Sequence, residues 1–138
     1  MTINWLTLAG VVVLQYIIGA LWYSVIFGKQ WIDINHPEGK PSKEEMAKLG
    51  KEAMPFYGIQ LVLTIITVGV QSYFVAMQPA NWFMTSILIW LGFLMPTVVQ
   101  GVIWSDPKNK KKALQIGILA LNYLVTIMLA GWILASFR

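Results

Sequence analysis

The sequence predicts an all-α integral membrane protein: a bundle of four transmembrane helices forming a single membrane domain over residues 1–138. Of these residues 57% are hydrophobic and only 12% are charged, about half the charged share of a soluble domain. The mean hydropathy is +0.64. Four uncharged stretches also exceed the roughly 20 residues that a helix needs to cross a hydrocarbon core. They are too long for barrel strands, so each is expected to be a helix.

The expected spans are residues 3–27, 55–77, 82–104 and 113–137, and none contains Asp, Glu, Lys, Arg or His. The first span is expected to be retained rather than cleaved as a signal peptide, because no basic residue precedes it. Pro96 lies midway along the third span. Proline removes a backbone donor there, which predicts a kink.

The lysines are distributed unevenly among the connections between the spans. The loop between the first two spans and the loop between the last two hold all nine: Lys29, Lys40, Lys43, Lys48, Lys51, Lys108, Lys110, Lys111 and Lys112. The opposite side has Arg138 alone. Positive loops stay in the cytoplasm, so we expect a multi-pass protein of the cell (inner) membrane with both termini outside. The lysines are then expected to meet anionic lipid headgroups of the bilayer, and no nucleic acid.

The long first loop, residues 28–54, is expected to contain a short amphipathic helix on the inner membrane surface. Ser42 and Glu45 have the spacing of a capping box, and Pro55 is expected to end this helix and open the second span. Apolar residues recur at helical spacing, at Met46, Leu49 and Ala53. Since glutamates offset the lysines here, a solvated loop helix is the alternative.

Uncharged polar residues mark the interior of the spans. They are Gln15 in the first, Gln60, Thr64, Thr67 and Gln71 in the second, Thr97 and Gln100 in the third, and Gln115, Asn122 and Thr126 in the fourth. The spacing places those of the second span on one helix face. Such residues either hydrogen-bond between helices, at about 0.6 kcal/mol each, or line a polar cavity.

Small residues predict close backbone contacts between helices. These are the pair Ala113 and Gly117, together with Gly19, Gly92, Gly101 and Gly131. Residues 19–22 and 101–104 share the pattern glycine, two apolar residues, tryptophan. The match indicates either an internal duplication or a chance similarity of apolar sequence.

One motif at the inner boundary carries a family resemblance. Its residues are Gly19, Trp22, Tyr23, Ser24, Gly28, Trp31 and Trp104. With the stretch from Trp90 to Trp104 and the pair Asn122 and Tyr123, it resembles the DUF1761 family of small bacterial membrane proteins. The resemblance implies a four-helix integral membrane protein without an assigned activity, and it supplies no catalytic or ligand-binding residue.

The chemistry-bearing residues do not predict an enzyme. The candidates Asp33, His36 and Asp106 have no recognised catalytic spacing, and the chain has no cysteine. One histidine predicts neither a metal site nor a cofactor. We expect a small membrane protein that acts by packing with itself, as a homo-oligomer, or with a membrane partner. The alternative is a passive channel or carrier for a neutral solute or cation, because proton coupling would need an ionisable residue in a span.

Overall fold

The computed structural model describes residues 4–137, so Ile3, where the first predicted span begins, and Arg138 lie outside the described residues. The helices are α1 (Trp5–Leu21), the π-helix η1 (Trp22–Ile26), α2 (Gly28–Asn35), α3 (Lys43–Met77), the 3-10 helix η2 (Pro79–Asn81), α4 (Trp82–Ile89), the π-helix η3 (Trp90–Leu94), α5 (Met95–Ile103) and α6 (Lys112–Ser136). No strand occurs in this part of the chain. Four continuous helical stretches are long and apolar enough to cross a membrane: Trp5–Ile26, Lys43–Met77, Pro79–Ile103 and Lys112–Ser136.

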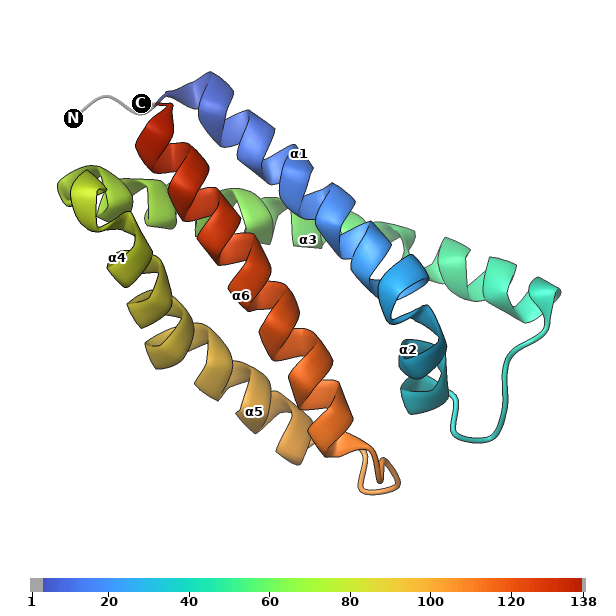
Figure 1. Ribbon diagram of the computed structural model, residues 1–138. Helices are drawn as coiled ribbons and strands as arrows, with labels where there is room; N and C mark the ends of the chain where they lie inside the picture. The colour runs from blue at the N-terminus through green and yellow to red at the C-terminus, as the bar shows by residue number, and fades with distance from the viewer. Residues whose placement is uncertain (1–3, 138) are drawn as a thin grey trace.

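Helix α6 is the centre of the arrangement. It contacts α1, α3, α4 and α5, and Figure 1 shows it running between α1 and the α4–α5 pair. In its most apolar window 44% of the residues are buried, against 11% in each of the other three stretches. The surrounding helices therefore present most of their apolar side chains outward.

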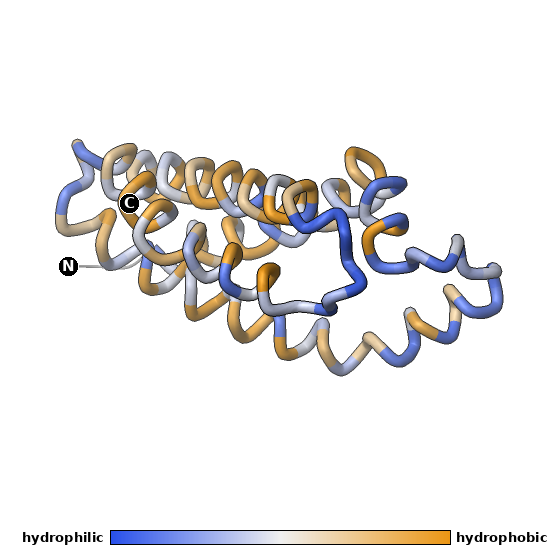
Figure 2. The backbone as a smooth tube through the Cα atoms, turned by 90° about the horizontal axis from the view of Figure 1, so that it is seen from below, coloured by the Kyte–Doolittle hydropathy of each residue, from blue (hydrophilic) through white to orange (hydrophobic). Residues whose placement is uncertain are grey.

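The first and last described residues, Asn4 and Phe137, lie at the same end of the bundle, here called the termini end (Figure 1). Asn4 and Thr7 at the start of the chain donate side-chain hydrogen bonds to the carbonyl of Phe137, at 3.2 and 2.7 Å. The opposite end, the loop end, carries α2 and the connections 36–42 and 104–111. Figure 2 shows the hydrophilic segments gathered mainly there.

The apolar core lies toward the termini end. It combines residues from three helices: Leu8, Val11 and Val12 of α1, Val68 and Val75 of α3, and Ala130 and Leu134 of α6. Toward the loop end α1 and α6 diverge (Figure 1). The two halves of each span therefore lie in different packing environments.

Helix α3 corrects one prediction. The capping box is present, with Ser42 Oγ accepting from the Glu45 N–H at 3.2 Å and Glu45 Oε2 accepting from the Ser42 N–H at 2.8 Å. The helix does not end at Pro55, however, but continues for 35 residues to Met77. Proline removes one donor, and the carbonyl thereby freed belongs to Lys51, an exposed residue at the loop end that water can solvate. Residues 43–54 are thus continuous with the helix of the second span rather than a separate helix. The separate short helix of the loop is α2.

The irregularity expected at Pro96 takes the form of a π-helical turn just before it. The N–H of Met95 bonds to the carbonyl of Trp90, five residues earlier. Helix α5 then begins at Met95, so Pro96 occupies its first turn, where an N–H has no intrahelical partner to lose. Helix η1 has the same wide turn, closed by the bond from the Phe27 N–H to the Trp22 carbonyl at 2.9 Å.

Candidate functional site

The threonines of the polar stripes bond within their own helices. Each hydroxyl donates to the carbonyl four residues earlier, as Thr64, Thr67, Thr97 and Thr126 do at 2.8, 2.9, 2.6 and 2.9 Å. This satisfies the hydroxyl without a neighbouring helix. These four residues therefore neither join two helices through their hydroxyls nor leave those donors free for a ligand.

Gln71 is the stripe residue that bonds between helices. Its side chain is 2% exposed, and Nε2 donates to the carbonyl of Ile127 at 2.7 Å and to Ser86 Oγ at 3.4 Å. A Cβ on Gly131 would collide with Ser86 Oγ and lie 3.2 Å from Gln71 Nε2. Helices α3, α4 and α6 thus meet with no room for another atom, an arrangement here called the Gln71 contact. Ser86 is 0% exposed, and sequence reasoning did not single it out.

The other stripe amides lie apart from one another. Gln60 and Gln100 are exposed, and Gln15 is half-buried on α1. Asn122 is buried, and within residues 4–137 its Nδ2 has no hydrogen-bond partner, as is also true of Gln71 Oε1. Gln115 lies at the loop end. The amides therefore do not converge on one shared cavity between the helices.

The aromatic motif forms the turn from α1 into α2. The rings of Trp22 and Phe27 lie 5.1 Å apart between centroids, and those of Tyr23 and Trp31 lie 4.7 Å apart. Ser24 donates to the carbonyl of Ala20, and Gly28 begins α2 in a buried position. Gly19 has no described atom within 4 Å of where its Cβ would lie, beyond its own helix backbone and chain neighbours.

Two tryptophans hold α6 at neighbouring positions. The indole of Trp22 donates to the carbonyl of Ile118 at 3.0 Å, and that of Trp90 donates to the carbonyl of Ala120 at 2.9 Å. Each tryptophan is the first residue of a π-helix. Trp90 is therefore the structural counterpart of Trp22, whereas Trp104, the counterpart expected from the repeated pattern, is 86% exposed at the end of α5.

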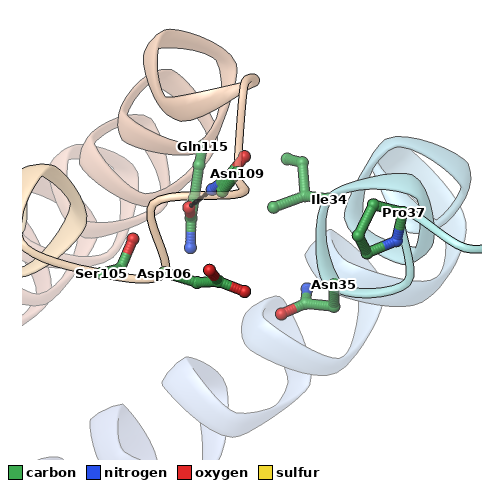
Figure 3. A pocket seen from close by; sticks show the side chains of 7 residues that line it. All are labelled: Ile34, Asn35, Pro37, Ser105, Asp106, Asn109 and Gln115. Atoms are coloured by element: carbon green, nitrogen blue, oxygen red, sulfur yellow. Dashed lines mark hydrogen bonds between the residues drawn. The ribbon is translucent and has the colours of Figure 1, made fainter.

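A polar pocket of about 160 Å³ lies at the loop end, between the end of α2 and the α5–α6 connection (Figure 3). It is lined by Ile34, Asn35, Pro37, Ser105, Asp106, Asn109 and Gln115. Side-chain bonds shape the connection: Asp106 Oδ1 accepts from the Lys108 N–H, and Asn109 donates to Gln115 Oε1 at 2.6 Å. Of the polar residues expected within the spans, Gln115 is the one in this lining.

Charges connect the same two elements beside the pocket. Lys111 Nζ lies 3.9 Å from Asp33 Oδ2, with both side chains about half exposed. Lys112 Nζ donates to the carbonyls of Ile103 and Ser105, which closes the end of α5. Asp33 thus pairs with Lys111, while His36 follows the end of α2. Within the described residues no group of three His, Cys, Asp or Glu side chains could hold a metal ion.

Comparison with known proteins gives one match. No curated protein and no solved structure matches the chain. The family model described as "Protein of unknown function (DUF1761)" matches residues 6–135, nearly the whole chain. Four helical stretches suited to a multi-pass membrane protein thus coincide with a family match over the same residues, and the chain belongs to the DUF1761 family.

Proposed function

We propose that this protein is inserted in the cell membrane with four spans, both termini outside and the loop end in the cytoplasm. The charge distribution supports this orientation, because all nine lysines lie in the loops and helix ends of the loop end. Lysine-rich loops are retained on the cytoplasmic side. Lys108 and Lys110 would then face anionic lipid headgroups.

We propose further that the protein acts by helix packing, chiefly with a second copy of itself. The main evidence is the difference in free space around its glycines. Beside Gly131 in α6, Ser86 occupies the space that a Cβ would take. Gly19, Gly92 and Gly101 on the surrounding helices have no described atom within 4 Å of their Cβ positions, apart from their own helix backbone and chain neighbours. Glycines on membrane helices let a second backbone approach closely. The open glycines therefore suit contacts outside the single chain.

The placement of the polar residues gives less support to a channel or carrier. The stripe threonines are satisfied locally, and the amides Gln60 and Gln100 lie on exposed surfaces. A polar path would need such groups to face one another along the bundle. We likewise propose no catalytic role for Asp33, His36 and Asp106, because Asp33 pairs with Lys111 and Asp106 caps a turn.

The orientation is tested by cysteine labelling, since the chain has no cysteine and each introduced one is unique. In intact cells an impermeant maleimide should label Asn81→Cys. It should label Lys48→Cys and Lys110→Cys only after the membrane is permeabilised. Labelling of Lys48→Cys and Lys110→Cys from opposite sides would contradict four spans.

Association is tested by measuring the mass of the protein in mild detergent by light scattering. The unaltered chain should exceed the mass of one copy, and Gly92→Leu or Gly101→Leu should lower it toward one copy. Both sites are open within the chain, so the melting temperature should hold within a few degrees. A monomer at every concentration for the unaltered chain would refute self-association.

A further inference from the structure

The loop-end pocket has unused hydrogen-bonding groups. Asn35 donates through Nδ2 to the Trp31 carbonyl, which leaves its Oδ1 open, and Ser105 donates to the Val102 carbonyl, which leaves its oxygen free to accept. Asp106 uses Oδ1 for the Lys108 N–H and keeps Oδ2. Figure 3 shows the Asn35 oxygen turned toward Asp106. Two acceptors, Asn35 Oδ1 and the Asp106 carboxylate, therefore face the same small space.

One donor complements these acceptors. Gln115 uses Oε1 to accept from Asn109, and its Nε2 has no bond to the described residues. In Figure 3 this nitrogen points into the pocket. A ligand that fits the lining therefore offers several donors around a positive charge and one acceptor beside them.

We propose that this pocket binds a primary ammonium group that carries an oxygen nearby, as in ethanolamine. An ammonium has three N–H donors, two of which match Asp106 Oδ2 and Asn35 Oδ1 and leave the third for solvent. The carboxylate supplies the opposite charge, and a charge-assisted hydrogen bond is about twice as strong as a neutral one. A metal ion fits less well, because the residues described include no cluster of three ligating side chains.

The size and position of the pocket agree with this ligand class. A pocket of about 160 Å³ is well above what a single water needs, which leaves room for a molecule of the size of ethanolamine. Trp104, directly before Ser105, is 86% exposed, as suits an aromatic anchor at the membrane boundary. Under the proposed orientation the ammonium could thus come from a phosphatidylethanolamine headgroup as well as from a free amine. Only the lipid source depends on that orientation.

The test uses the full chain in nanodiscs of phosphatidylcholine, titrated with ethanolamine while tryptophan fluorescence is recorded. Choline is the matched cation, with the same charge but no N–H donor. We expect saturable ethanolamine binding and at least tenfold weaker choline binding. Asp106→Asn keeps an oxygen for the Lys108 N–H and should raise the ethanolamine Kd at least tenfold. Glu38→Gln, which removes an exposed charge in the neighbouring connection, should leave it unchanged.

Adding phosphatidylethanolamine to the nanodiscs separates the two sources. If the lipid headgroup reaches the pocket, the apparent Kd for free ethanolamine rises; an unchanged Kd assigns the site to free amines. Equal responses to ethanolamine and choline, or an Asp106→Asn variant that binds like the unaltered chain, would refute the proposal. Neither result would bear on the oligomeric state or on the labelling pattern of the introduced cysteines.

Discussion

The two ends of the bundle are held together by different kinds of interaction. At the termini end Val11, Val68 and Val75 are at most 1% exposed, and the Gln71 contact leaves no free volume. Toward the loop end α1 and α6 diverge, and directional bonds join the helices: indoles on α6 carbonyls, the Tyr16 hydroxyl on the Tyr57 carbonyl at 2.8 Å, and one half-exposed ion pair. Close packing tolerates almost no change of volume, whereas separate hydrogen bonds can break one at a time. Substitutions at the two ends should therefore affect different measurements.

The largest effect is expected for Gly131→Ala in α6. The added methyl group collides with Ser86, and such overpacking costs about 1–3 kcal/mol of unfolding free energy. Gly117→Ala is the control, because it lies on the same helix with open space at its Cβ. Its free energy of unfolding should rise by up to about 1 kcal/mol, because alanine has a higher helix propensity than glycine. The measurement is denaturation in mixed detergent micelles, followed by circular dichroism. Equal stability of the two variants would refute a tight termini end.

A smaller loss is expected for Val68→Ala in α3. Val68 is 0% exposed in the apolar core, so truncation removes packing contacts and costs about 1–2 kcal/mol in the same assay. Val62→Ala, on an outward face of the same helix at 56% exposure, should change the free energy by less than about 0.5 kcal/mol. If Val62→Ala were as costly as Val68→Ala, the outward face would be packed as tightly as the core.

The smallest change in stability is expected at the two tryptophans. Trp22→Phe or Trp90→Phe removes one hydrogen bond to α6 and should cost about 0.6 kcal/mol. Loss of the bond should increase local opening between α6 and the neighbouring helix more than it lowers the free energy of unfolding. A cysteine at Ile118, which is 2% exposed, should react faster with a maleimide when combined with Trp22→Phe. An unchanged labelling rate would mean that packing, rather than the indole bonds, holds the loop end.

Much of the fold could be predicted because a helix able to cross a membrane needs a minimum length and an apolar composition. The central place of α6 could not be, since the four stretches have nearly the same hydropathy, between 1.8 and 2.1. Pro96 predicted a kink in the third span, where the structure has a π-helical turn, but no proline marks the equivalent turn at Trp22. The end predicted at Pro55 was wrong because one missing donor does not stop a helix whose freed carbonyl belongs to an exposed residue.

The candidate sites show the same limit. Gln71 is recognisable as a polar residue in an apolar span, but its neighbour Ser86 is not, because a single small hydroxyl fits any helix. Of Gly19, Gly92, Gly101 and Gly131, only Gly131 has side chains of other helices of this chain close to its Cβ position. The pocket brings Asn35 next to Asp106 from distant connections (Figure 3). The spacing of residues along the sequence does not show which distant connections lie next to each other in the fold.

The bonds from Asn4 and Thr7 to Phe137 bring the two ends of the described part of the chain together. A short linker there, with a cut in the connection 36–42, would yield a circular permutant that keeps every helix and every helix–helix contact. Chain ends that lie close together are what such rearrangements require. The new ends would emerge beside the lysines, so under the proposed orientation a fluorescent reporter fused to them would lie on the opposite side of the membrane from one fused to the original ends.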